Sequence, residues 1–150
     1  MHRNVVAHDF YITEDNVQQL QGMTFVFICL DGTGDRRMIA ERLEQWGIPF
    51  IDVGMGVELV DGSLLGIVRI TTSTSQKRDH IWSNNRIPLS QTAAGDEYSR
   101  NIQIADLNAL NATLAVIRWK KHFGFYHDQE REHYTTYTID GNILINEDKP

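Results

Sequence analysis

The fold of this chain is decided by the stretch TFVFICLDGTGDRRMIAERLEQWGIPFIDVGMGVE, residues 24–58. A continuous apolar run of strand length, residues 23–30, leads into Asp31, a glycine turn and an arginine pair. Apolar residues then recur at helical spacing as far as Trp46, and Pro49 opens a second apolar run. Unbroken apolar runs of this length are typical of buried parallel strands. The pattern therefore predicts a strand, a helix and a parallel strand joined by a right-handed crossover.

Composition and charge describe an ordinary globular protein. A chain of 150 residues is long enough for one domain with a sizeable core. The net charge is −6 and the basic residues are scattered, whereas a nucleic-acid surface normally needs a clustered basic face. No run approaches the roughly 20 apolar residues of a membrane span, and the N-terminus has no apolar core of signal-peptide length. We therefore expect a single domain over residues 1–150, cytoplasmic, with no nucleic-acid or membrane partner.

Two Asp-Gly pairs predict further strands. The turn at Asp61-Gly62 precedes an apolar run over residues 63–72, and so short a turn predicts that this strand is antiparallel to the one before it. Residues 133–139 and 142–146 flank Asp140-Gly141, a strong hairpin signal. The carboxyl-terminal part of the sheet should therefore be antiparallel.

Between these strands lie a long polar segment and the strongest helix of the chain. Residues 73–100 are polar and lack periodicity, which predicts a flexible crossover loop. Residues 101–121 carry a wide apolar stripe and few polar residues, so this helix should be buried against the sheet or against another subunit. The sequence as a whole predicts an α/β fold with a Rossmann-like βαβ core, a mixed sheet, antiparallel carboxyl-terminal strands and one long buried helix.

Asp31 is the first candidate for a binding residue. It follows the first strand, and ligands of open α/β sheets bind at the carboxyl ends of the strands. Residues 31–37, DGTGDRR, could cradle a phosphate at a helix N-terminus or hold a magnesium ion. Arg37 occupies the place of the third glycine of G-x-G-x-x-G, and Cys29 occupies the place of the nucleophile of a D-x-D-G-T phosphatase. The alternative is that Asp31 caps the helix and Gly32 only makes the turn; spacing alone favours neither.

Other candidate positions have plainer interpretations. Gly54 and Gly56 follow the second apolar run, where they permit either close approach of a ligand or a simple turn or bulge. Cys29 lies inside an apolar run, which predicts a buried and inert thiol. Asn108 and Asn111 share a helix face and either hydrogen-bond across an interface or face solvent. The six histidines form no ligand pair and there is one cysteine, so no zinc site is expected.

Residues 26–72 and 101–121 together resemble the carboxyl-terminal half of ThiF/MoeB/HesA proteins, the ubiquitin-activating-enzyme-like adenylyltransferases. The resemblance covers most of the chain, from about residue 12 to the final hairpin. It implies that Asp31 helps to bind magnesium-ATP, with Arg36 in the place of the family's arginine. Gly32 stands where the family usually has asparagine, and Gly54 and Gly56 match its glycine-rich strand exit. These residues would form the cofactor-binding set, with Asp31 and Arg36 as the catalytic candidates and Asp31 as the magnesium ligand.

The same resemblance implies an incomplete enzyme. The family's glycine-rich nucleotide loop belongs to an amino-terminal half, and nothing before Thr24 supplies one. Residues 73–100 contain no cysteine, which implies no thioester step and no structural zinc. The expected function is thus a nucleotidyltransferase half that is inactive alone, forms a homodimer and meets a ubiquitin-like or other carrier protein. Two other functions remain open: a non-enzymatic dimerisation or interaction module of the same fold, and a small phosphate- or nucleotide-binding α/β protein.

Overall fold

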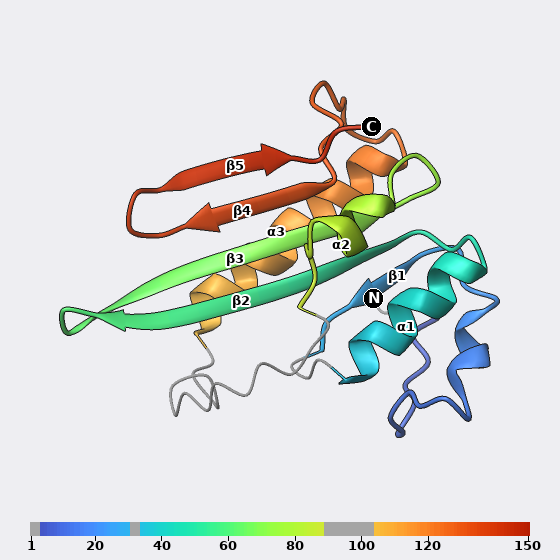
Figure 1. Ribbon diagram of the computed structural model, residues 1–150. Helices are drawn as coiled ribbons and strands as arrows, with labels where there is room; N and C mark the ends of the chain where they lie inside the picture. The colour runs from blue at the N-terminus through green and yellow to red at the C-terminus, as the bar shows by residue number, and fades with distance from the viewer. Residues whose placement is uncertain (1–3, 31–33, 89–103) are drawn as a thin grey trace.

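The structure is a computed structural model and describes residues 4–30, 34–88 and 104–150. It is a five-stranded sheet with strand order β1-β2-β3-β4-β5 and helices on both faces (Figure 1). β1 is parallel to β2, and every other neighbouring pair is antiparallel. The elements are η1 (Val17–Leu20), β1 (Val26–Ile28), α1 (Gly34–Gln45), β2 (Phe50–Val60), β3 (Ser63–Ser73), α2 (Asp79–Ser83), α3 (Ala105–His122), β4 (Tyr134–Thr138) and β5 (Ile143–Glu147). The predicted α/β fold with a mixed sheet is confirmed.

The predicted βαβ unit is present, with a shorter first strand than the apolar run suggests. In the part of the chain that the structure describes, β1 lies at one edge of the sheet and pairs only with the start of β2, from Val26 opposite Phe50 to Ile28 opposite Asp52. α1 covers this part of the sheet, and its Leu43 packs in a core cluster with Ile28 and Phe50. The carboxyl end of β1 and the amino end of α1 therefore lie at the edge where the sequence predicts a ligand.

β2 and β3 form a long hairpin around Asp61 and Gly62, whose φ angles of 49° and 81° suit a two-residue turn. Gly54 and Gly56 lie inside β2, so the prediction that they form an exit from the strand is wrong. β3 pairs with β4 only from Ile67 to Thr71, which leaves the outer part of the hairpin as a two-stranded ribbon.

α3 packs on the other face of the sheet, against β2 and β3. Gly66 of β3 makes this approach possible, because a Cβ there would lie 2.5 Å from the Cδ1 atom of Leu107. Val116 and Ile117 of α3 are 44% and 37% exposed. The predicted burial of this helix therefore holds for one side only.

The described part of the predicted crossover loop contains regular structure. Residues 79–83 form α2, and the side chains of Ile81 and Ile87 are completely buried beside α1. The apolar residues of so short a helix show no periodicity, which is why the sequence does not reveal it. Residues 89–103 lie outside the described residues. Within the described ranges, no helix combines the length and the apolar character that crossing a membrane requires.

Candidate functional site

A buried carboxylate held by two arginines occupies the edge of the sheet at the carboxyl end of β1. Asp52, on β2, is completely buried. Arg69 of β3 donates a hydrogen bond from Nη2 to Asp52 Oδ2 at 2.6 Å. Arg36, in the first turn of α1, places Nε 3.1 Å from Asp52 Oδ1 in an ion pair that is not aligned as a hydrogen bond. Three elements are therefore joined through one side chain.

Arg36 also fixes the chain before the turn. Its Nη2 atom donates to the backbone carbonyl of Leu30, which follows β1. The side chain of Arg36 is only 6% exposed, so its charge is directed at Asp52 and Leu30. The arginine that the sequence predicts for nucleotide binding thus ties the start of α1 to the end of the β1 segment. Asp31 and Gly32, the other candidates in this turn, lie outside the described residues.

The two glycines of β2 have different surroundings. A Cβ on Gly54 would overlap the Arg69 guanidinium, so glycine at this position makes room for the arginine to reach Asp52. The Gly54 carbonyl also accepts a hydrogen bond of 2.9 Å from Nδ2 of Asn111 on α3. Gly56 is exposed, and a Cβ there would meet nothing within 4 Å. Gly54 belongs to the site, and Gly56 does not contact it.

The charged groups near the end of β1 do not make the thiol of Cys29 more reactive. Cys29 is exposed, contrary to the prediction of a buried thiol, because β1 ends at Ile28 and the chain then leaves the sheet edge. Partial burial of the sulfur raises the pKa of Cys29, nearby Asp52 raises it further, and Arg36 opposes both. Burial likewise raises the pKa of Asp52, against the two arginines, which favour its charged form. A raised thiol pKa disfavours the thiolate that a nucleophile requires.

The described residues do not complete a magnesium site here. Both oxygens of Asp52 are engaged by arginine. Over the described ranges, no group of three or more His, Cys, Asp or Glu side chains is placed to hold a metal ion. Magnesium at this edge would therefore rest on Asp31 together with oxygen atoms supplied by a nucleotide or by water.

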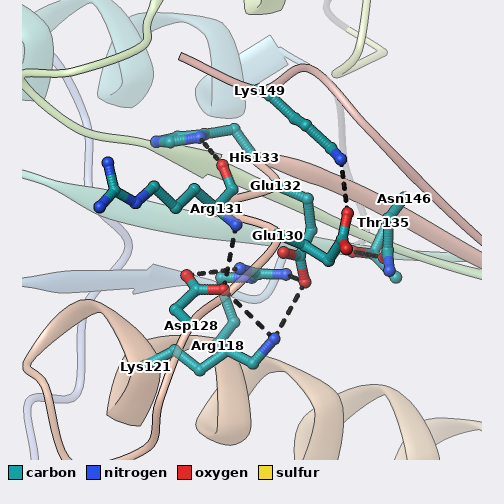
Figure 2. A network of polar contacts seen from close by, with 10 residues as sticks. All are labelled: Arg118, Lys121, Asp128, Glu130, Arg131, Glu132, His133, Thr135, Asn146 and Lys149. Carbon is teal, nitrogen blue, oxygen red and sulfur yellow. Dashed lines mark hydrogen bonds and ion pairs between the residues drawn. The ribbon is translucent and has the colours of Figure 1, made fainter.

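A second polar cluster lies on the opposite face of the sheet, between α3 and the segment before β4 (Figure 2). Arg118 and Lys121 of α3 both contact Oε1 of Glu132, with the lysine Nζ at 3.2 Å. Both also reach Asp128, at 3.4 Å. Arg118 is buried in line with Asn111 and Ala115, on the side of α3 that faces the sheet. The sequence contains one signal for this cluster: Arg118 falls at the helical spacing of the apolar residues that face the sheet. We did not predict the cluster from this signal.

The cluster borders a cavity of about 290 Å³. His133, in its wall, is uncharged at neutral pH, because burial lowers its pKa to about 4. Its Nδ1 atom lies 3.1 Å from the Arg131 carbonyl, and its Nε2 atom lies 3.0 Å from Thr74 Oγ1. A donating Nδ1–H and an accepting Nε2 satisfy both contacts.

Comparison with known proteins adds no relative: no family model matches the chain, and no curated protein matches it. The resemblance to ThiF-type proteins therefore rests on the residues and motifs themselves.

Proposed function

We propose that this chain is the carboxyl-terminal half of a ThiF-like adenylyltransferase, which activates a protein carboxyl terminus with ATP when a glycine-rich nucleotide loop is supplied by another segment. The observation that carries the proposal is the set of contacts that Arg36 makes with Leu30 and Asp52. Arg36 ties the start of α1 to the Leu30 carbonyl and to Asp52 of the neighbouring parallel strand. The sequence between them contains Asp31, the residue that the family uses for magnesium-ATP.

The open edge of β1 supports a half-domain. Among the described residues, β1 pairs with β2 on one side only, and Phe27 is 40% exposed. Parallel strands are normally flanked by further strands and covered on both faces. An amino-terminal half that carries the nucleotide loop would extend the sheet at this edge.

The chemistry proposed is nucleotidyl transfer. A carboxylate oxygen of the acceptor protein attacks the α-phosphorus of ATP, the bond to the bridging oxygen breaks, and pyrophosphate leaves. Positioning of the triphosphate and stabilisation of its charge dominate such reactions. The amino end of α1 favours an anion through its free backbone N–H groups. That contribution alone does not align a triphosphate, so the isolated chain should not catalyse ATP–pyrophosphate exchange.

Nucleotide binding tests the proposal. In heteronuclear NMR, magnesium-ATP should shift the backbone amides of Gly34 and Asp35 at the start of α1. The shifts should be lost in Asp31→Asn and kept in Asp61→Asn, which removes a carboxylate from the distant β2–β3 turn at a φ that asparagine tolerates. Saturable shifts that persist in Asp31→Asn, or no shifts at the amino end of α1, would contradict the assignment. So would exchange activity of the isolated chain that disappears in Asp31→Asn.

Exposed apolar residues on α3 favour the second candidate, an interaction module of the same fold that binds no nucleotide. Val116 of α3 is 44% exposed, and Ile117 is 37% exposed where it borders a pocket between α3 and the sheet. Pairing through such a surface needs no nucleotide. An unchanged NMR spectrum in magnesium-ATP, together with stable dimerisation, would select the module over the enzyme.

A further inference from the structure

The last strand of the sheet, β5, has one open side. In the part of the chain that the structure describes, β5 pairs with β4 alone and forms the edge of the sheet opposite β1 (Figure 1). Ile143, Leu144 and Ile145 follow one another in β5 and are 51%, 49% and 46% exposed. Natural proteins usually protect an edge strand with charged residues or proline. β5 has no proline and no charge before Glu147, so its middle is a template for pairing with another strand.

The backbone of Leu144 is oriented for such pairing. The N–H group of Ile139 donates to the Gly66 carbonyl of β3 at 3.0 Å. Successive residues of an antiparallel strand direct their backbone groups to opposite sides. The backbone groups of Thr136, three residues earlier, therefore point the other way, toward Ile145 of β5. Those of Leu144, the neighbour of Ile145, point away from β4 and toward the open side.

The sequence around Leu144 reads the same in both directions: Asn142-Ile143-Leu144-Ile145-Asn146. Two β5 strands can therefore pair antiparallel with their Leu144 residues opposite each other on a two-fold axis. In that register Ile143 of one copy lies opposite Ile145 of the other, and Asn142 lies opposite Asn146. A shift of two residues in either direction would instead place Leu144 opposite an asparagine. The strand is thus its own best complement in one register.

The two asparagines can bond to each other in this register. Oδ1 of Asn146 accepts from Thr135 Oγ1 at 2.8 Å, and Oδ1 of Asn142 accepts from the Tyr137 hydroxyl at 2.6 Å. Over the described ranges, neither Nδ2 group donates to an acceptor. A carboxamide oxygen has two lone pairs, so each asparagine can donate to the oxygen of the one opposite while keeping its bond to β4.

The charges at the ends of the strand also permit the pairing. Glu147 falls opposite Gly141 of the other copy, which has no side chain. Asp148 falls opposite Asp140, but its charge is matched by Arg86, whose Nε atom lies 2.6 Å from Asp148 Oδ2. No bare pair of like charges therefore arises along this register, as like charges directly opposite would be destabilising.

We propose that β5 pairs antiparallel with β5 of a second copy of this chain, with Leu144 on the two-fold axis, so that the two five-stranded sheets become continuous. Strands this short bury less than the roughly 800 Å² per partner of a standard interface, so a dissociation constant of about 1 mM is expected. The contact is separate from Val116 of α3, because α3 packs against β2 and β3. Where the protein is concentrated, β5 pairing joins copies that already associate through α3.

Cross-linking tests the register. The full chain carries Cys29→Ser, which removes the exposed native thiol, and is oxidised with oxidised glutathione. Leu144→Cys should form a disulfide between copies, because directly opposite Cα atoms lie about 5.5 Å apart. Ile143→Cys alone and Ile145→Cys alone should not, because each lies about 7–8 Å from its own counterpart. A mixture of these two variants should cross-link.

The strength of the pairing is measured by sedimentation equilibrium from about 50 µM to 1 mM, in a Val116→Lys background that removes the α3 contact. Monomer should convert to dimer over this range. Leu144→Lys should weaken the association at least about tenfold, because two lysines meet on the axis. The matched control is Leu64→Lys, at a leucine of β3 that is 43% exposed, and it should leave the association unchanged.

Each outcome decides the proposal. Preferential cross-linking of Leu144→Cys, together with that of the mixture, supports pairing in the stated register. Ile143→Cys that cross-links to itself as fast as Leu144→Cys, or Leu64→Cys that does so, would overturn it. A chain with Val116→Lys that stays monomeric at about 1 mM would also overturn it and leave the edge to an extended segment of another protein. The disulfide pattern gives this answer even if Leu144→Lys disturbs folding.

Discussion

The Arg69 guanidinium crosses β2 above Gly54 to reach Asp52, where its Nη2 atom lies 2.6 Å from the carboxylate. Arg69 of β3 and Gly54 of β2 are directly opposite in the strand register. Asp52 lies two residues before Gly54 in β2. The ion pair is therefore diagonal, and it exists because the residue between its partners has no side chain.

Gly54→Ala should destabilise the protein by about 1–3 kcal/mol, because the added methyl group overlaps Arg69 and forces it off Asp52. Urea unfolding followed by circular dichroism measures the change. Gly56→Ala is the matched control: it makes the same change two residues away, where nothing lies within 4 Å. Its effect should be close to zero or slightly stabilising. Equal losses in the two variants would show that Arg69 does not depend on Gly54.

Asp52→Asn should cost more, about 3–5 kcal/mol, because it leaves Arg36 and Arg69 buried without a negative partner. Glu41→Gln removes an exposed carboxylate that pairs with Arg37 at 2.8 Å, and should cost no more than about 0.5 kcal/mol. The free energies of unfolding of the two variants give the comparison. A loss in Asp52→Asn no larger than that in Glu41→Gln would mean that the buried pair does not stabilise the edge.

Acid should destabilise the protein through His133. Its pKa falls from 6.5 to about 4 in the folded state, chiefly through burial, so the unfolded chain binds the proton more tightly. The contribution of the neutral His133 ring to the free energy of unfolding is fully present above pH 6.5, and it is lost as the pH falls toward 4. The loss from this residue should be about 2 kcal/mol by pH 5. Burial also lowers the pKa of His80, which acts in the same direction.

Urea unfolding between about pH 7.5 and pH 5 measures this dependence. In His133→Gln the stability should fall less over this range than in the unaltered protein. The control is His127→Gln, at an exposed position, whose profile should follow that of the unaltered protein. A His133→Gln profile as steep as the original would assign the acid sensitivity to other groups.

The chain should self-associate through the exposed apolar residues of α3. Val116 and Ile117 are both partly exposed, and symmetric dimers are the commonest arrangement for such surfaces. Sedimentation velocity at about 50 µM should show a dimer, and Val116→Lys should shift it toward monomer. Gln45→Lys, an exposed charge change on α1, should leave the dimer intact. A single monomeric species of the unaltered chain at this concentration would contradict the prediction.

Local signals in the sequence predicted the order of the main elements. The pairs Asp61-Gly62 and Asp140-Gly141 each close a hairpin between neighbouring strands, and this can be inferred from a few residues. The long helix was also predictable, from its apolar period. The predicted range of 101–121 compares with Ala105–His122 in the structure, where residues 101–103 are not described.

The site depended on contacts that no local pattern contains. Asp52 and Arg69 meet because β2 and β3 pair in one register, and Arg36 joins them from a helix. Asp52 looked like one more residue of an apolar strand, and Gly54 looked like the end of that strand. Cys29 was predicted to be buried from an apolar run, but β1 lies at the sheet edge and ends one residue earlier. Edge position and register are properties of the whole sheet.

The two-stranded ribbon at the end of the β2–β3 hairpin offers a place to attach a reporter. Its turn, Asp61-Gly62, is exposed, and β4 pairs with β3 only as far out as Ile67. Exposed turns of this kind tolerate inserted sequence, because no buried contact is displaced. A fluorophore or affinity peptide placed there would lie apart from both the Asp52 edge and the Glu132 cavity. It would report on partners of either one while leaving the side chains of both intact.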